Sequence, residues 1–129
     1  MKELKKGDSE EKMELTHILD DLRSQGNFTG VFLAKRNGEL IDENVKKFID
    51  SKELVSMCAS VLEGATELSE TMENQQVNKI IAELDEETIF IVKVNENSFL
   101  ICILNAQSNS RLIVENLEEY IQKIKSTLL

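Results

Sequence analysis

The stretch from Ser51 to about Asn74 carries two apolar stripes, and the prediction of the fold starts from it. The stretch contains no proline, and its apolar residues recur in steps of three and four, the spacing of a helix face. Asp50, followed three residues later by Glu53, is typical of a capping box at a helix start. We therefore predict one helix over residues 51–74, roughly 36 Å long at about 1.5 Å per residue.

The two stripes of this helix lie side by side. The first stripe consists of Leu54, Cys58, Val61, Ala65, Leu68 and Met72. The second stripe consists of Val55, Ala59, Leu62, Thr66 and Ser69. A helix packed on one sheet needs only one apolar face, so two interpretations stay open. The helix is either generously buried in a monomer, or it lies between its own sheet and a partner helix.

The pattern on either side of the helix predicts five strands. Residues 28–35 contain a continuous apolar run, and Asn37-Gly38 is a strong hairpin signal that leads into a half-polar strand over residues 39–44. After the helix, a mixed strand is predicted at 76–84 and two largely apolar strands at 88–94 and 99–104. Short polar turns join these three strands, which predicts an antiparallel meander. Their polarity places strands 39–44 and 76–84 at the sheet edges.

Two further helices are predicted at the ends of the chain. The first begins at Asp8 or Ser9 and runs to about Gln25, with Gly26 as its stop, and the last is capped by Ser108 or Ser110. Central strands that are apolar on both sides need helices on both faces of the sheet. The chain is therefore predicted to be an α/β protein, with a flexible N-terminus at 1–8 and a single domain at 9–129.

Composition and charge narrow the classes of partner. The chain has 129 residues, with 15 basic and 24 acidic side chains and a formal net charge of −9, which disfavours binding to nucleic acid. No apolar run approaches the roughly 18 residues of a membrane span, and the N-terminus has no secretory signal. Cys58 and Cys102 lie in apolar runs and are predicted to be buried and reduced. We expect a cytoplasmic protein.

The sequence carries no recognisable motif for catalysis or cofactor binding. The sequence contains neither a P-loop nor a G-x-G-x-x-G run, and His17 is its only histidine. The arginines near loops, Arg23, Arg36 and Arg111, are the only candidates for an arginine finger and are interpreted as surface residues. We therefore predict a protein that is not an enzyme and that has no catalytic residue, cofactor or metal site.

Several local features resemble the roadblock/LC7 domain family. They are Gly30–Ala34 followed by Asn37-Gly38, the long helix at 51–74, and the meander that ends in FLICILN. The resemblance covers about residues 15–128. It implies a five-stranded antiparallel sheet in the order 2-1-5-4-3, with the long central helix on one face and the N- and C-terminal helices on the other. The edge strands inferred from polarity fall at the two ends of that order.

The resemblance also implies partners. Family members dimerise through the central helix and third strand into a continuous ten-stranded sheet, and they serve Ras-like small GTPases as platforms or regulators, or act as dynein light chains. The implied partner is a second copy or a roadblock paralogue, and then a Ras-like small GTPase. The dimer interface is predicted to contain Val55, Ala59, Leu62, Thr66, Ser69, Val77, Lys79 and Ile81. The alternative is a small sensory or ligand-binding domain of PAS-like or profilin-like type.

Overall fold

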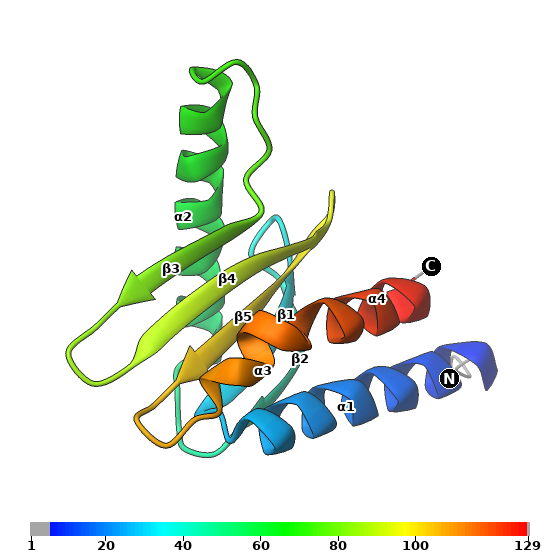
Figure 1. The fold of residues 1–129 in the computed structure, drawn as a ribbon. Helices are drawn as coiled ribbons and strands as arrows, with labels where there is room; N and C mark the ends of the chain where they lie inside the picture. The colour runs from blue at the N-terminus through cyan, green and yellow to red at the C-terminus, as the bar shows by residue number, and fades with distance from the viewer. Residues whose placement is uncertain (1–5, 129) are drawn as a thin grey trace.

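The computed structural model describes the backbone of residues 6–128 and the side chains of residues 10–128. Most of the segment predicted to be flexible, 1–8, lies outside the described residues. The elements, shown in Figure 1, are α1 (Lys6–Gly26), β1 (Gly30–Lys35), β2 (Leu40–Val45), α2 (Ser51–Glu70), β3 (Lys79–Glu83), β4 (Thr88–Asn95), β5 (Ser98–Leu104), α3 (Ser110–Glu115) and α4 (Leu117–Leu128).

The five strands form one antiparallel sheet in the order β2-β1-β5-β4-β3. The predicted strand order and both predicted edges are confirmed. All seven residues of β5 are buried, because this strand lies at the centre of the sheet and is covered on both faces. The half-polar β2 and the mixed β3 are at the edges, where alternate side chains can reach solvent.

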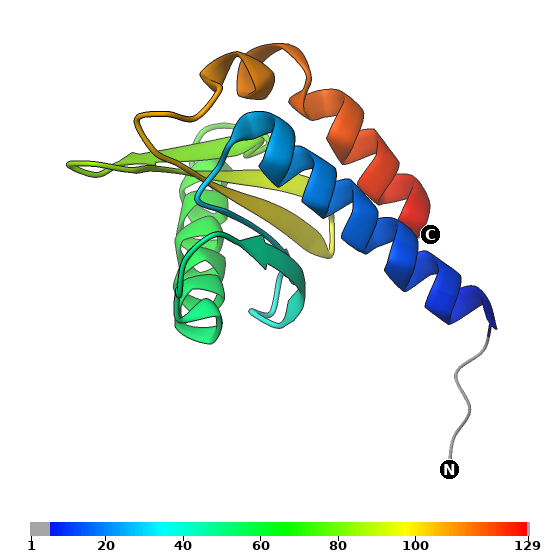
Figure 2. The same cartoon turned by 90° about the horizontal axis from the view of Figure 1, so that it is seen from below.

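Helices cover both faces of the sheet, as predicted. Figure 2 shows α1 and α4 side by side on one face and α2 on the other. Alternate residues of β5 divide between two hydrophobic clusters: Phe99 and Ile101 pack beneath α2, whereas Leu100 and Cys102 pack beneath α1 and α4. Burial of both faces explains why β1 and β5 carry continuous apolar runs instead of an alternating pattern.

The central helix begins where the sequence indicates and ends earlier. Asp50 is the N-cap, and its side chain accepts a hydrogen bond from the backbone N–H of Glu53 at 3.2 Å. The helix ends at Glu70 and not near Asn74. Glu73 and Asn74 have positive φ angles of 62° and 56°, a left-handed backbone that cannot continue a right-handed helix.

The single C-terminal helix predicted from the sequence is in fact two helices. Asn116 separates α3 from α4 with φ −122° and ψ −8°, outside helical geometry. The N-cap of α3 is Asn109, so the predicted caps Ser108 and Ser110 were wrong. The Ser108 hydroxyl instead donates a hydrogen bond to the backbone carbonyl of Asn27 at 2.9 Å. The apolar spacing continues across the break and therefore gives no sign of it.

Both cysteines are free and buried, as predicted. Burial raises the pKa of the Cys58 thiol to about 11 and that of the Cys102 thiol to about 12, because the thiolate is poorly solvated inside the protein. Both thiols therefore stay protonated at neutral pH, in keeping with a packing role and not a nucleophilic one.

Candidate interaction surface

The face of α2 that packs against the sheet of its own chain takes Val55 and Leu62 from the second stripe and Leu54 and Cys58 from the first. Val55 and Leu62 have exposed fractions of 0% and 2% and lie in the cluster beneath α2. Both residues were predicted to contact a partner, but the structure shows them buried against their own sheet. The two stripes have the same spacing and lie next to each other, so periodicity alone could not decide which part of this wide apolar surface faces the sheet.

One flank of α2 is held by the hairpin between β1 and β2. The Arg36 guanidinium donates to the Thr66 hydroxyl at 3.3 Å and lies 3.6 Å from the Glu63 carboxylate. Gly38 has φ +94°, and a Cβ added there would lie 3.6 Å from the Cα of Ser56 on the helix. The left-handed backbone favours glycine at this position, whereas the distance to the helix is that of an ordinary van der Waals contact. This flank of the helix is therefore occupied within the chain.

The opposite flank of α2 is exposed and apolar. Successive residues turn by about 100° along a helix, so the first stripe continues onto the side away from Glu63 and Thr66. Val61 and Leu68 are 50% and 67% exposed. We call the exposed large side chains here the α2 apolar flank; they are Met57, Val61 and Leu68 on the helix and Met72 in the turn that follows it. An apolar strip of this kind beside an open sheet edge is typical of an interaction site.

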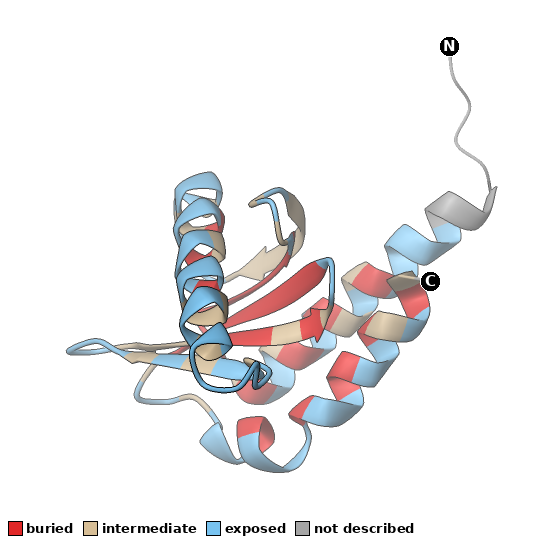
Figure 3. Cartoon of the chain, turned by 90° about the horizontal axis from the view of Figure 1, so that it is seen from above, coloured by how far each residue is buried: buried red, intermediate tan, exposed pale blue. Residues whose placement is uncertain are grey.

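The β3 strand gives the second part of the surface, because among the described residues no strand pairs with its outer edge. Figure 3 shows β3 at the rim of the sheet, exposed or half-buried, whereas the central strands are buried. Val77 and Ile80 are half-buried and pack on the cluster beneath α2. Ile80 therefore extends the apolar surface from α2 towards the edge.

The predicted interface residues are thus brought to one region but point in different directions. Ala59, Thr66 and Ser69 are half-buried along α2, and Thr66 and Ser69 donate hydrogen bonds to carbonyls within the helix. Lys79 and Ile81 are exposed on β3, and their register partners Val92 and Phe90 pack on the α4 side of the sheet. These two side chains therefore face away from α2.

Sequence reasoning missed part of this surface. None of the exposed apolar residues Met57, Val61, Leu68 and Met72 was named as an interface residue, nor was Ile80. The alternation along β3 could have revealed Ile80. Ile80 and Ala82 point to one face of the sheet and Lys79 and Ile81 to the other, so only one of these two pairs can continue the surface of α2.

Other candidate chemistry is sparse in the described part of the chain. Among residues with described side chains, no cluster of three or more His, Cys, Asp or Glu residues is placed to hold a metal ion. No described helix has both the length and the apolar character needed to cross a bilayer. Arg23 is half-buried and donates to the Phe28 carbonyl at 3.4 Å, and Arg36 is engaged by α2, which leaves Arg111 exposed.

The fold and this surface define a class of protein: an α/β interaction domain with an apolar helix flank beside an unpaired sheet edge. The family model described as "Roadblock/LC7 domain" matches residues 15–105. The chain therefore belongs to the Roadblock/LC7 domain family, a family of non-catalytic interaction domains. No curated protein sequence matches the chain.

Solved structures share the fold at low sequence identity. MglB of Myxococcus xanthus is 18% identical, with a TM-score of 0.82 over 89% of this chain and 94% of that one. The gliding protein MglB of Thermus thermophilus is 8% identical, with a TM-score of 0.84 over 91% and 90%. A Roadblock/LC7 domain from Streptomyces avermitilis is 10% identical, with a TM-score of 0.79 over 88% and 96%.

Profilin also has a related arrangement of sheet and helices. Profilin II of Acanthamoeba castellanii is 11% identical, with a TM-score of 0.63 over 89% of this chain and 99% of that one. The likeness is one of fold alone, so it carries no ligand or partner over to this chain.

Proposed function

We propose that two copies of this chain associate through α2 and β3, and that the dimer binds a Ras-like small GTPase and regulates or tethers it. The observation that carries the dimer is the α2 apolar flank beside the unpaired edge of β3. Pairing two β3 edges would satisfy their open backbone groups and cover the apolar flank in the same step. The family resemblance supports the choice of GTPase, and one MglB structure is described as a tetrameric arrangement.

The sequence of β3 suits antiparallel pairing with itself. A two-fold axis at Ile81 would place Lys79 opposite Glu83 of the second copy, and Ile80 opposite Ala82. Opposite charges would then face each other at both ends of the paired β3 strands, and no like charges would be opposite one another. This register ends in a favourable charge pair on each side of the axis.

Charge reversal at the ends of β3 tests this register. Lys79→Glu alone would place two carboxylates opposite each other at both ends, and we expect the dimer dissociation constant to rise about tenfold. Glu83→Lys alone should act similarly with two ammonium groups. The double variant restores opposite charges and should regain most of the affinity, as measured by analytical ultracentrifugation. A double variant that dimerises no better than the weaker single variant would rule out the register.

The GTPase proposal is tested after the solution mass is known. Light scattering behind a sizing column should give the mass of two chains, kept on dilution. The dimer is then titrated with purified Ras-like GTPases loaded with GDP or a GTP analogue, and we expect one of them to bind with a preference for one nucleotide state. A clean monomer contradicts the homodimer. A stable dimer that binds no GTPase, but melts at a higher temperature with a small ligand, favours the sensory alternative.

A further inference from the structure

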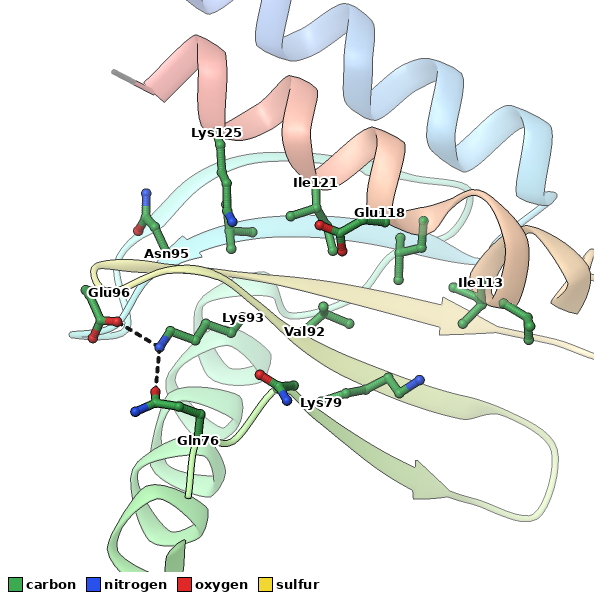
Figure 4. Close-up of a pocket in the computed structure, with 14 residues that line it drawn as sticks. Gln76, Lys79, Val92, Lys93, Asn95, Glu96, Ile113, Glu118, Ile121 and Lys125 are labelled. Atoms are coloured by element: carbon green, nitrogen blue, oxygen red, sulfur yellow. Dashed lines mark hydrogen bonds and ion pairs between the residues drawn. The ribbon is translucent and has the colours of Figure 1, made fainter. Parts of the chain in front are cut away.

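A groove opens on the face of the sheet opposite α2, between α4 and the β3–β4 edge. Its volume is about 640 Å³. Figure 4 shows Ile121 and Lys125 reaching down from α4 above Val92 of β4, with unfilled space between the helix and the strands, whereas Lys93 runs sideways to Glu96 and Gln76. The groove is complete within one chain. Its helical wall, 110–125, lies beyond the stretch that the family model matches.

The lining combines an apolar floor with a positive rim. Val92, Val94 and Ile121 are buried side chains at its base, and Val114 is an apolar rim residue that is 84% exposed. Lys79, Lys125 and Glu118 surround this floor, whereas Lys93 lies at its edge in an ion pair with Glu96 that leaves no net charge. The rim is therefore net positive by one charge on a chain whose formal charge is −9.

Lys125 on α4 is available to pair with an anionic ligand, whereas Lys93 is already paired. Lys93 donates to the Glu96 carboxylate at 2.8 Å and to the Gln76 side chain at 3.1 Å, and this contact lowers the pKa of Glu96. Lys125 has no ion pair within the described residues. A ligand carboxylate near α4 could therefore pair with Lys125 without first displacing another ion pair.

We propose that this groove binds an amphipathic α-helix of a partner protein whose polar face is acidic. The floor is a sheet face, and the backbone of β4 is already paired on both sides with β3 and β5. An occupant gains no backbone partner there, so it must satisfy its own hydrogen bonds, and a helix does so. Apolar residues on one face of that helix fit the floor, and carboxylates beside them reach Lys125.

The test uses a designed peptide of about 18 residues, five turns of helix. Leucines form one face and glutamates the other, and the control peptide has lysine in place of every glutamate. We expect the acidic peptide to shift the backbone amide resonances of β4, α3 and α4 in a ¹⁵N–¹H spectrum of the full chain. Lys125→Glu should weaken its binding about fivefold to tenfold, whereas Lys123→Glu, the same change on another side of α4, should leave it unchanged.

Each alternative result overturns the proposal. Equal binding of the lysine peptide, equal weakening by the two lysine variants, or shifts confined to α2 would each show that the groove does not select an acidic helix. Absence of binding would do the same. The measurement is independent of the proposed dimer, because the groove lies in one chain: a monomeric protein that binds the acidic peptide retains this proposal and loses the other.

Discussion

Truncating Leu62 to alanine is expected to lower the free energy of unfolding by about 2–5 kcal/mol. Leu62 is 2% exposed and packs with Val55 beneath α2, so the substitution leaves a cavity in the cluster on that face of the sheet. Urea unfolding followed by circular dichroism measures the loss. The slope of free energy against urea should stay unchanged, because the surface exposed on unfolding is nearly the same.

Leu68→Ala is the matched control on the same helix. Leu68 is 67% exposed, and its truncation should change the stability of an isolated chain by less than about 0.5 kcal/mol. Both variants are measured at two protein concentrations. The loss from Leu62→Ala should be the same at both, whereas any loss from Leu68→Ala should grow with the population of dimer. A reversed ranking of the two variants would contradict the orientation of α2.

The rotation of α2 about its own axis could not be predicted from the sequence. The sequence predicts the helix and its N-cap because the apolar spacing and Asp50 are local signals. It cannot assign the two stripes, because both have helical spacing and differ by only a small rotation about the helix axis. The orientation depends on long-range contacts: Arg36 of the hairpin donates to Thr66 on one flank of α2, and Val55, Cys58 and Leu62 pack into the cluster beneath the helix.

The edge and central strands could be predicted because polarity and burial are linked in a single-layer sheet, whereas the full strand order came from the family resemblance. Continuous apolar runs in β1 and β5 require cover on both faces, whereas the polar residues of β2 and β3 tolerate an edge. The break at Asn116 could not be predicted in this way, because Ile113, Leu117 and Ile121 keep helical spacing across it. Three-dimensional packing against α1 and β4 decides how the last two helices run.

Leu68→Glu is expected to convert the proposed dimer into a folded monomer. The side chain lies on the α2 apolar flank, so the substitution would bury an unpaired carboxylate in the interface, at a cost of about 3 kcal/mol or more. The dimer dissociation constant should therefore rise at least about 100-fold. Light scattering behind a sizing column measures the mass, and circular dichroism checks that the monomer keeps its helices and strands.

Met13→Glu is the matched control, because it also places a carboxylate on an exposed, apolar helical position. Met13 is 64% exposed on α1, on the sheet face opposite α2, and its replacement should leave the mass at two chains. A Leu68→Glu protein that remains dimeric would remove α2 from the interface. The charge-reversal variants of β3 would then decide what holds the dimer: rescue by the double variant would leave strand pairing as its basis. Failure of that rescue as well would place the interface on a different surface of the chain.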